Sequence, residues 1–201
     1  MKSSYKFYRG CFRLANPVIR FFRPFEVIGM ENICKGAAVV CANHSAMIDP
    51  FLIALVFGIE SHMHVLAKIE LFKIPVIKQI LEKLGMIRVN RGIIDVASIK
   101  SSLGYLKKGE KVVIFPEGTR VTEDESVEAK NGAVKLAERA GIPVIPFFIP
   151  RKKPFFKKVR LIVGKPYLIE KLRNRRSVEE YVKLSEDLMN RIHSLDSKGL
   201  V

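Results

Sequence analysis

Short apolar runs with the character of β-strands alternate with segments of helical periodicity along the whole chain of 201 residues. Such alternation is typical of an α/β fold, with helices packed against a largely parallel or mixed sheet. The length suits one sizeable core, and no Pro/Gly/Ser-rich linker divides it. We therefore expect one α/β domain at 25–201, preceded by an N-terminal amphipathic helical segment at 1–24. Strands are predicted at 25–29, 37–42, 62–67, 86–89, 111–115, 143–149 and 158–163, and helices at 5–22, 50–58, 75–84, 93–107, 129–140 and 177–194.

The N-terminal segment has its charge on one side. Its six basic residues fall within an arc of about 100° when projected at ~100° per residue, and residues 1–25 contain no acid. A basic helix rich in phenylalanine is typical of a membrane interface, although packing against the domain's own core is the alternative. Pro17 is predicted to kink this helix or split it in two. The apolar side comprises Phe7, Cys11, Leu14, Val18, Phe21 and Phe22.

The net charge of +15 indicates an anionic partner. A second basic stretch, residues 151–176, has eleven Lys and Arg against one acid, Glu170, and contains Phe155 and Phe156. Charge alone would allow an anionic membrane or a nucleic acid, or simply a solvated basic face. Because no nucleic-acid recognition motif is present, we expect a membrane surface and no nucleic acid.

No run is long enough to cross a bilayer. The longest apolar run, Phe51 to Ile59, has nine residues, whereas a spanning helix needs ~20. The cysteines, three in number, lack metal-ligand spacing and suit free thiols in a reducing compartment. We therefore expect a peripheral or monotopic protein on the cytoplasmic face of a membrane.

A histidine and an aspartate follow the buried strand at 37–42. His44 lies where this strand ends, and Asp49, before Pro50, is expected to be the N-cap of the next helix. A turn of this length can fold the carboxylate onto one imidazole nitrogen, which leaves the other as a general base. Taken alone, the pair could equally be a helix cap and a strand-end histidine.

A second motif follows the strand at 111–115. It reads Phe115-Pro116-Glu117-Gly118-Thr119-Arg120 and combines a glycine with fixed charges. Strand ends are where α/β proteins build their sites. Both motifs thus lie at strand ends, where a site can form.

Together these motifs resemble those of the glycerolipid acyltransferases, specifically the 1-acylglycerol-3-phosphate acyltransferases, which carry Asn-His-four residues-Asp and Phe-Pro-Glu-Gly-Thr-Arg. Weaker matches lie at Gly85–Arg91 and Ile142–Pro146, and the resemblance covers roughly residues 25–165. Asn90 departs from the family, which often has an acid there, but Arg91 is present.

The resemblance implies acyl transfer from a thioester donor, acyl-CoA or acyl-ACP, to lysophosphatidate, giving phosphatidate. His44 would take the proton of the sn-2 hydroxyl, and Asp49 would fix the histidine tautomer. The donor is a co-substrate, so no cofactor is expected. Glycerol 3-phosphate or another lysophospholipid remains open as the acceptor, and a basic module that only binds anionic membrane is the alternative outside enzymes.

The same motifs suggest how the acceptor phosphate is bound. Arginine binds phosphate oxygens in pairs, so Arg120, in its Thr119-Arg120 context, is the first candidate and Arg91 the second. Gly118 would offer its N–H to phosphate or oxyanion, and Glu117 would orient Arg120 or the loop rather than act as a second base. Lys68 matches a recurrent family lysine, with a surface ion pair as the alternative.

One further cluster carries possible chemistry. His62 and His64 would present two imidazoles on one face of a strand, as a metal pair can. The sequence offers no evident third ligand, so no metal site is predicted.

Overall fold

The computed structural model describes the chain except residues 1, 94, 122–126, 173, 175 and 199–201, which include Arg173 and Arg175 of the second basic stretch. Its centre is a seven-stranded sheet in the order β1-β7-β6-β2-β5-β3-β4. All neighbouring pairs are parallel except β6 and β7, so the sheet is mixed. The strands are β1 Phe25–Ile28, β2 Ala38–Ala42, β3 Met63–Lys68, β4 Ile87–Val89, β5 Lys111–Ile114, β6 Val144–Phe148 and β7 Val159–Val163. Each matches a predicted strand.

The predicted helices also form. They are α1 Lys2–Phe22, α2 Asp49–Phe57, α3 Pro75–Lys83, α4 Val96–Lys107, α5 Gly132–Ala140 and α6 Val178–Lys198. Two short 3₁₀ segments, η1 Met30–Asn32 and η2 Ile69–Lys73, had no signal in the periodicity. No helix of the described residues is both long enough and apolar enough to span a bilayer.

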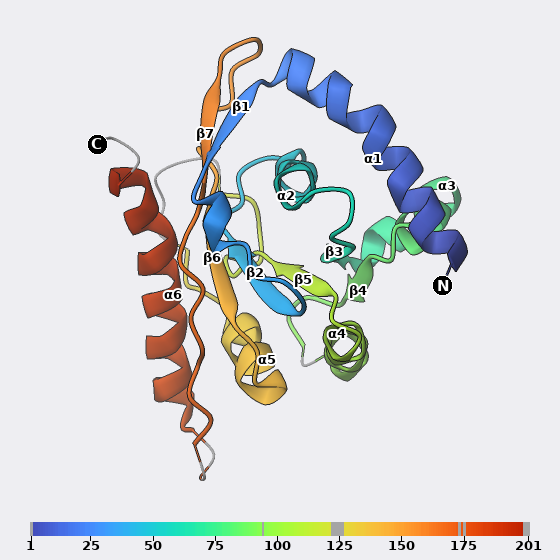
Figure 1. The fold of residues 1–201 in the computed structure, drawn as a ribbon. Helices are drawn as coiled ribbons and strands as arrows, with labels where there is room; N and C mark the ends of the chain where they lie inside the picture. The colour runs from blue at the N-terminus through green and yellow to red at the C-terminus, as the bar shows by residue number, and fades with distance from the viewer. Residues whose placement is uncertain (1, 94, 122–126, 173, 175, 199–201) are drawn as a thin grey trace.

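The sheet separates two apolar cores. Helices α1 and α2 cover one face, and α4, α5 and α6 cover the other (Figure 1). Along β2 the side chains alternate between these cores: Val40 and Ala42 enter the first, and Val39 and Cys41 the second. Burial on both faces explains why β2, β5 and β6 are almost continuously apolar in sequence.

Helix α1 differs from the prediction at Pro17. It runs as one helix through the proline instead of dividing. Pro17 is exposed, so the carbonyl that loses its N–H partner can bind water, and the helix keeps its packed side.

The packed side of α1 also differs from the apolar side read from the sequence. Tyr8 is buried, and Phe12 and Ile19 pack on the first core. The predicted apolar side remains largely in solvent: Leu14 is 76% exposed and Phe21 67%. Helix α1 therefore both packs on the domain and presents a second, unburied apolar stripe.

Parallel strands give the sheet two chemically distinct edges. Strands β2, β3, β4, β5 and β6 point the same way, so their C-terminal ends meet at one edge. We call it the carboxyl edge, and the opposite one, where β3 and β5 begin, the amino edge. Both predicted motifs lie at the carboxyl edge, as loops that follow β2 and β5.

Candidate active site

His44 and Asp49 form the predicted pair. The Nδ1 atom of His44 lies 3.0 Å from Oδ2 of Asp49, and the imidazole stacks on Phe115 with ring centroids 4.0 Å apart. Since a carboxylate accepts, Nδ1 carries the hydrogen. The Nε2 atom, on the far side of the ring, then holds a free lone pair and bonds to no described residue. A partly exposed imidazole in this tautomer is suited to remove a proton.

Asp49 is fixed more firmly than a helix cap would be. Asp49 was predicted to be the N-cap of α2. In the structure it is the first residue of the helix, and Ile48 is the N-cap. The side chain of Asp49 turns back into the loop, where Oδ2 accepts the backbone N–H groups of Ser45 at 2.7 Å and Ala46 at 2.8 Å. Burial alone would raise the pKa of Asp49, but these hydrogen bonds, that from His44 and the charge of Lys153 together hold the pKa below its usual value.

Lys153 is a site residue that sequence reasoning missed. Its Nζ lies 3.1 Å from Oδ1 of Asp49 and donates to Ser45 Oγ and to the carbonyl of Pro150, both at 2.7 Å. Its side chain is 3% exposed, and burial lowers its pKa while Asp49 opposes that shift. In the sequence Lys153 is one of eleven basic residues in its stretch. Only its neighbour Pro154 and its place after β6 set it apart, so no pattern identified it.

Glu117 holds the loop that carries His44. Its Oε2 accepts the backbone N–H of His44 at 2.6 Å, and the side chain is buried. Glu117 was predicted to orient either Arg120 or the loop, and the described contacts are with the loop. Burial raises the pKa of Glu117 to about 7, with the hydrogen bond from His44 and the charge of Arg151 opposing.

Two further bonds fasten the same loop. Asn43 donates to the carbonyl of Ile149 at 2.7 Å and accepts its N–H at 2.9 Å, beyond the end of β6. The N–H of Val121 donates to the carbonyl of His44 at 2.8 Å. The backbone of His44 is thus held on both sides, which positions its ring before any substrate arrives.

The Gly118–Arg120 part of the second motif forms a turn followed by two exposed residues. Gly118 has a φ of +68°, which favours glycine. Its N–H, predicted to serve phosphate or oxyanion, donates to the carbonyl of Phe115 at 3.0 Å within the turn. Thr119 and Arg120 are exposed beside His44, and Arg120 forms no hydrogen bond or ion pair with the described residues.

Arg91 and Lys68 lie along the same edge but further away. Arg91 is exposed after β4, three strands from β2, which corresponds to roughly 14 Å at the usual spacing. Lys68 ends β3 and lies 3.7 Å from Glu70, the surface ion pair held open as its alternative. The structure thus places all three predicted cations at one edge, with Arg120 on the loop next to His44.

At the carboxyl edge, then, lies an oriented imidazole on a buried carboxylate, flanked by exposed cations. An imidazole held in this way is suited to remove a proton from a hydroxyl group, as enzymes that transfer groups to a hydroxyl require. A model of the Acyltransferase family matches residues 24–150, more than half of the chain, and the chain belongs to this family.

Individual proteins similar to this chain agree with the family assignment. The chain is 33% identical to the 1-acyl-sn-glycerol-3-phosphate acyltransferase of Bacillus subtilis over 95% of its own length and 98% of that protein. It is 32% identical to the protein of that name from Borreliella burgdorferi, with 66% of this chain and 53% of that one covered. Among solved structures, it is similar to the 1-acyl-sn-glycerophosphate (LPA) acyltransferase PlsC of Thermotoga maritima, with a TM-score of 0.64, 27% identity, and coverage of 98% of this chain and 79% of that one.

Proposed function

We propose that this protein transfers a fatty acyl group from a thioester donor to the sn-2 hydroxyl of 1-acylglycerol 3-phosphate and so makes phosphatidate. The observation that carries the proposal is the His44 pair, whose Nδ1 is held 3.0 Å from a buried carboxylate while Nε2 remains available. The relatives named above supply the acceptor, lysophosphatidate.

The reaction needs no protein nucleophile. Nε2 of His44 removes the proton of the acceptor hydroxyl, and the hydroxyl oxygen attacks the thioester carbonyl carbon. The tetrahedral intermediate collapses with cleavage of the C–S bond, and the imidazolium returns its proton to the leaving thiolate. Asp49 stabilises that imidazolium, and its own charge is balanced by Lys153 and two backbone N–H groups.

Lys153 contributes to this reaction indirectly, through its contacts with Asp49 and Ser45. Its Nζ donates to Ser45 Oγ at 2.7 Å and to the carbonyls of Pro150 at 2.7 Å and Arg151 at 3.3 Å, which accounts for all three of its hydrogens, and it forms an ion pair with Asp49 at 3.1 Å. It therefore has no donor left for an oxyanion, and we assign it the positioning of Asp49 and Ser45.

An apolar groove next to the pair suits an acyl chain. It runs between α1 and α2 and reaches β3 and the start of β4. Pro50 and Phe51, the residues directly after Asp49, line it, so one end lies close to the catalytic loop. The other lining residues include Phe12, Ile19, Leu55 and Met86. Apolar walls of this kind are what a fatty chain requires.

The acceptor phosphate would be bound by Arg120, with Arg91 as the second candidate. Arg120 is exposed on the loop that follows β5, next to β2 and His44. A guanidinium can give a phosphate two parallel hydrogen bonds. Arg91, two strands from β5, would reach the phosphate of a long substrate rather than the reacting hydroxyl.

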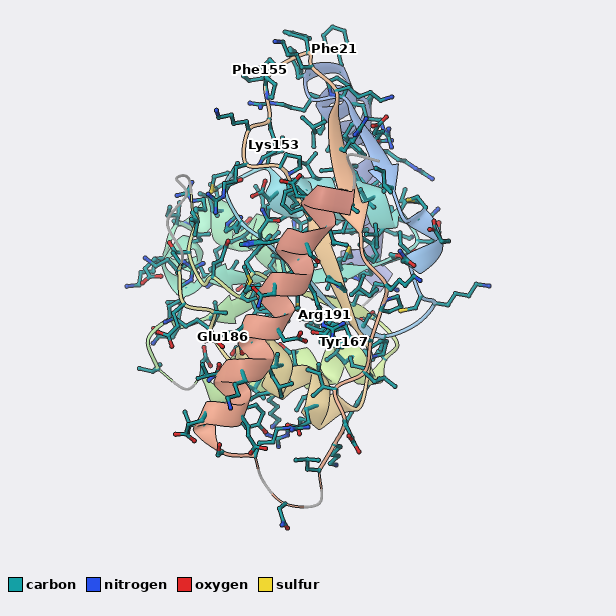
Figure 2. The ribbon with its side chains drawn as sticks, turned by 90° about the vertical axis from the view of Figure 1, so that its left-hand side faces the viewer. Phe21, Lys153, Phe155, Tyr167, Glu186 and Arg191 are labelled. Carbon is teal, nitrogen blue, oxygen red and sulfur yellow. The ribbon has the colours of Figure 1, made fainter. Side chains whose placement is uncertain are left out.

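The membrane contact would use an exposed group that we call the aromatic tip: Phe21, Phe22, Phe155 and Phe156. It joins the end of α1 to the loop after β6, with Phe156 5.8 Å from Phe21 and 5.6 Å from Phe22 between ring centroids. Figure 2 shows Phe21 and Phe155 together at one end of the molecule, above Lys153.

The aromatic tip brings together two stretches that the sequence offered as separate membrane candidates. Phe155 and Phe156 are 59% and 62% exposed, and the guanidinium of Arg23 lies over the Phe155 ring at 3.8 Å. Exposed rings that enter the acyl boundary beside cations at head-group level are typical of interfacial binding. We propose on this basis that the protein binds an anionic membrane surface, and the free thiols expected of its cysteines favour the cytoplasmic face.

One assay tests the activity. The purified protein is given liposomes containing lysophosphatidate with acyl-CoA or acyl-ACP, and free thiol and phosphatidate are measured. Equal release of thiol and phosphatidate with one of the two donors is expected. Thiol release without phosphatidate, or turnover only with a different acceptor, would refute the proposed acceptor while leaving the His44 chemistry open.

A sedimentation assay tests the membrane surface. Deleting α1 would uncover the first core, so paired substitutions are the sharper test. Phe21→Ser with Phe156→Ser should reduce binding to anionic liposomes by tenfold or more, since each buried ring contributes on the order of 1.5–3 kcal/mol. Leu168→Ser, at a residue 66% exposed in the segment that follows β7, is the control. Equal loss in both proteins, or in neither, would exclude the aromatic tip.

A further inference from the structure

A second cluster of histidine and carboxylate lies at the amino edge. His62 precedes β3, His64 lies within it, and Glu110 directly precedes β5. The side chains offer ligand atoms that all lie within 4.8 Å of one another. The catalytic pair is at the other edge of the sheet, so this cluster is outside the site described above.

The hydrogen-bond partners of His64 decide what its second nitrogen can do. Its Nδ1 lies 2.7 Å from the carbonyl of Gly85, and because a carbonyl only accepts, Nδ1 must carry the hydrogen. In a neutral imidazole Nε2 is then a bare lone pair. Yet Nε2 lies 2.9 Å from Oε2 of Glu110, which also can only accept when ionised. Two hydrogen-bond acceptors 2.9 Å apart repel each other unless a positively charged centre lies between them.

His62 repeats the arrangement more loosely. Its Nε2 lies 3.4 Å from the carbonyl of Leu84, and its Nδ1 faces Oε1 of Glu110 at 4.0 Å. Both imidazoles therefore turn one nitrogen to the Leu84–Gly85 backbone and the other to the two oxygens of one carboxylate. Histidines that ligate a metal characteristically donate their second N–H to a backbone carbonyl in this way.

The surroundings hold this geometry rigidly. Gly85 has a φ of +73°, and a Cβ there would lie 2.9 Å from His64 Nδ1, so only glycine brings its carbonyl so close. His64 is buried and stacks on Tyr105 with ring centroids 3.5 Å apart. Glu110 is 26% exposed, which leaves the cluster open to solvent on the carboxylate side.

We propose that His62, His64 and Glu110 bind one divalent transition-metal ion of the zinc type. Two imidazoles and a carboxylate are a ligand set that zinc accepts, at about 2.0–2.2 Å, with water completing the tetrahedron. Burial lowers the pKa of both histidines, which favours the neutral form that ligates. The third ligand is Glu110, 46 residues from His64, which the sequence pattern did not reveal.

The ion would have a structural role. It would hold the starts of β3 and β5 together, while the carbonyls of Leu84 and Gly85 accept from the other nitrogen of each imidazole. His62 also packs against Tyr5 and Tyr8 of α1, with ring centroids 5.6 and 4.8 Å apart. A bound ion would thus stabilise the surface against which α1 packs. It would take part in no step of acyl transfer.

Calorimetric titration of the tag-free, chelator-treated protein with zinc chloride tests the site. One equivalent should bind, and Glu110→Gln or His62→Gln should weaken binding by more than tenfold. Zinc should also raise the Tm of the unsubstituted protein and leave that of Glu110→Gln unchanged. Both substituted side chains are partly exposed, so these variants avoid disturbing the buried His64.

His193→Gln, at an exposed histidine of α6, and His44→Ala, at the catalytic pair, are the matched controls and should keep the unsubstituted affinity. If no stoichiometric zinc binds, or if the controls lose it as much as Glu110→Gln does, the proposal is wrong. A proton shared between His64 and Glu110 would then be the positive centre. Neither result depends on the acyltransferase activity.

Discussion

Each edge of the sheet holds a histidine about 3 Å from a carboxylate, and the two pairs differ in which nitrogen is engaged. At the carboxyl edge, Nδ1 of His44 meets Asp49 at 3.0 Å and Nε2 is left unpaired. At the amino edge, a backbone carbonyl takes Nδ1 of His64, and Nε2 meets Glu110 at 2.9 Å. The first arrangement leaves the lone pair of His44 Nε2 free to accept a proton. In the second, the lone pair of His64 Nε2 faces an oxygen of Glu110, which is also an acceptor.

The surroundings of the carboxylates explain the difference. Asp49 is fully buried and receives two backbone N–H groups and the ammonium of Lys153, so its charge is balanced without the histidine being protonated. Glu110 is partly exposed and faces two imidazoles. The two carboxylates therefore differ in how their charge is balanced, and this difference is the basis for proposing a general base at one edge and a cation site at the other.

The largest expected effect distinguishes the two histidine–carboxylate pairs by their effect on activity. His44→Ala should lower kcat by at least 10²–10⁴-fold, because it removes the base. Glu110→Gln, at the other pair, should leave kcat within about twofold, because this pair lies at the opposite edge. Initial rates of phosphatidate formation, with circular dichroism to verify folding, measure both. Near-normal turnover by folded His44→Ala protein would remove the distinction between the pairs.

The next effect concerns Lys153, the cation that forms an ion pair with Asp49. Lys153→Met should destabilise the protein by about 3–5 kcal/mol, since it leaves a buried carboxylate without its ammonium. Lys152→Met, at the exposed neighbour, should change stability by less than about 0.5 kcal/mol. Urea unfolding measures both. In an Asp49→Asn background the loss should shrink, and an undiminished loss would mean that Lys153 acts only through Ser45 and Pro150.

The sequence predicted more of the fold than of the site, for a physical reason. Strand and helix periodicities are local, and every strand and every α-helix that they indicated forms within a few residues of its expected place. His44 and Asp49 are five residues apart, so their pairing is also local. Lys153 reaches Asp49 across 104 positions, and Glu110 reaches His64 across 46. Such contacts depend on strand order, which periodicity does not give.

The sequence analysis also differed from the structure in how three groups are used. Asp49 looked like a helix cap, but Ser45 and Ala46 draw its carboxylate into the preceding loop. The N–H of Gly118 was expected to face substrate, but the turn at Phe115 uses it. The apolar side of α1 was read correctly as a stripe, but Tyr8 and Phe12, on another side, provide the packing.

A smaller effect should appear as a pH dependence at the carboxyl edge. Burial raises the pKa of Glu117 to about 7 from an ordinary 4.5, so the folded protein holds its proton more tightly than the unfolded chain does. Its contribution to stability is therefore present below about pH 4.5 and is lost as the pH rises to about 7. Glu117→Gln keeps an acceptor for His44 but does not titrate.

Relative to the unsubstituted protein, Glu117→Gln should gain stability between pH 5 and pH 8 on the order of 2 kcal/mol. Urea unfolding at both pH values measures it. A constant difference between Glu117→Gln and the unsubstituted protein across this range would show that Glu117 is ionised throughout.

The smallest effect tests whether the exposed cations of the carboxyl edge serve the acceptor. Arg120→Ala should raise the apparent KM for lysophosphatidate about tenfold and leave that for the thioester nearly unchanged, because the lost partner binds phosphate. Arg120→Lys should recover only part, since one ammonium cannot give the paired hydrogen bonds of a guanidinium. Lys108→Ala removes an exposed cation near the amino edge, beside Tyr105, and should change neither KM. If Arg120→Ala impairs only the thioester, Arg120 belongs to the donor, and Arg91 becomes the first candidate for the phosphate. If Lys108→Ala matches Arg120→Ala, the effect reflects net charge at the membrane, and the two edges do not differ in this respect.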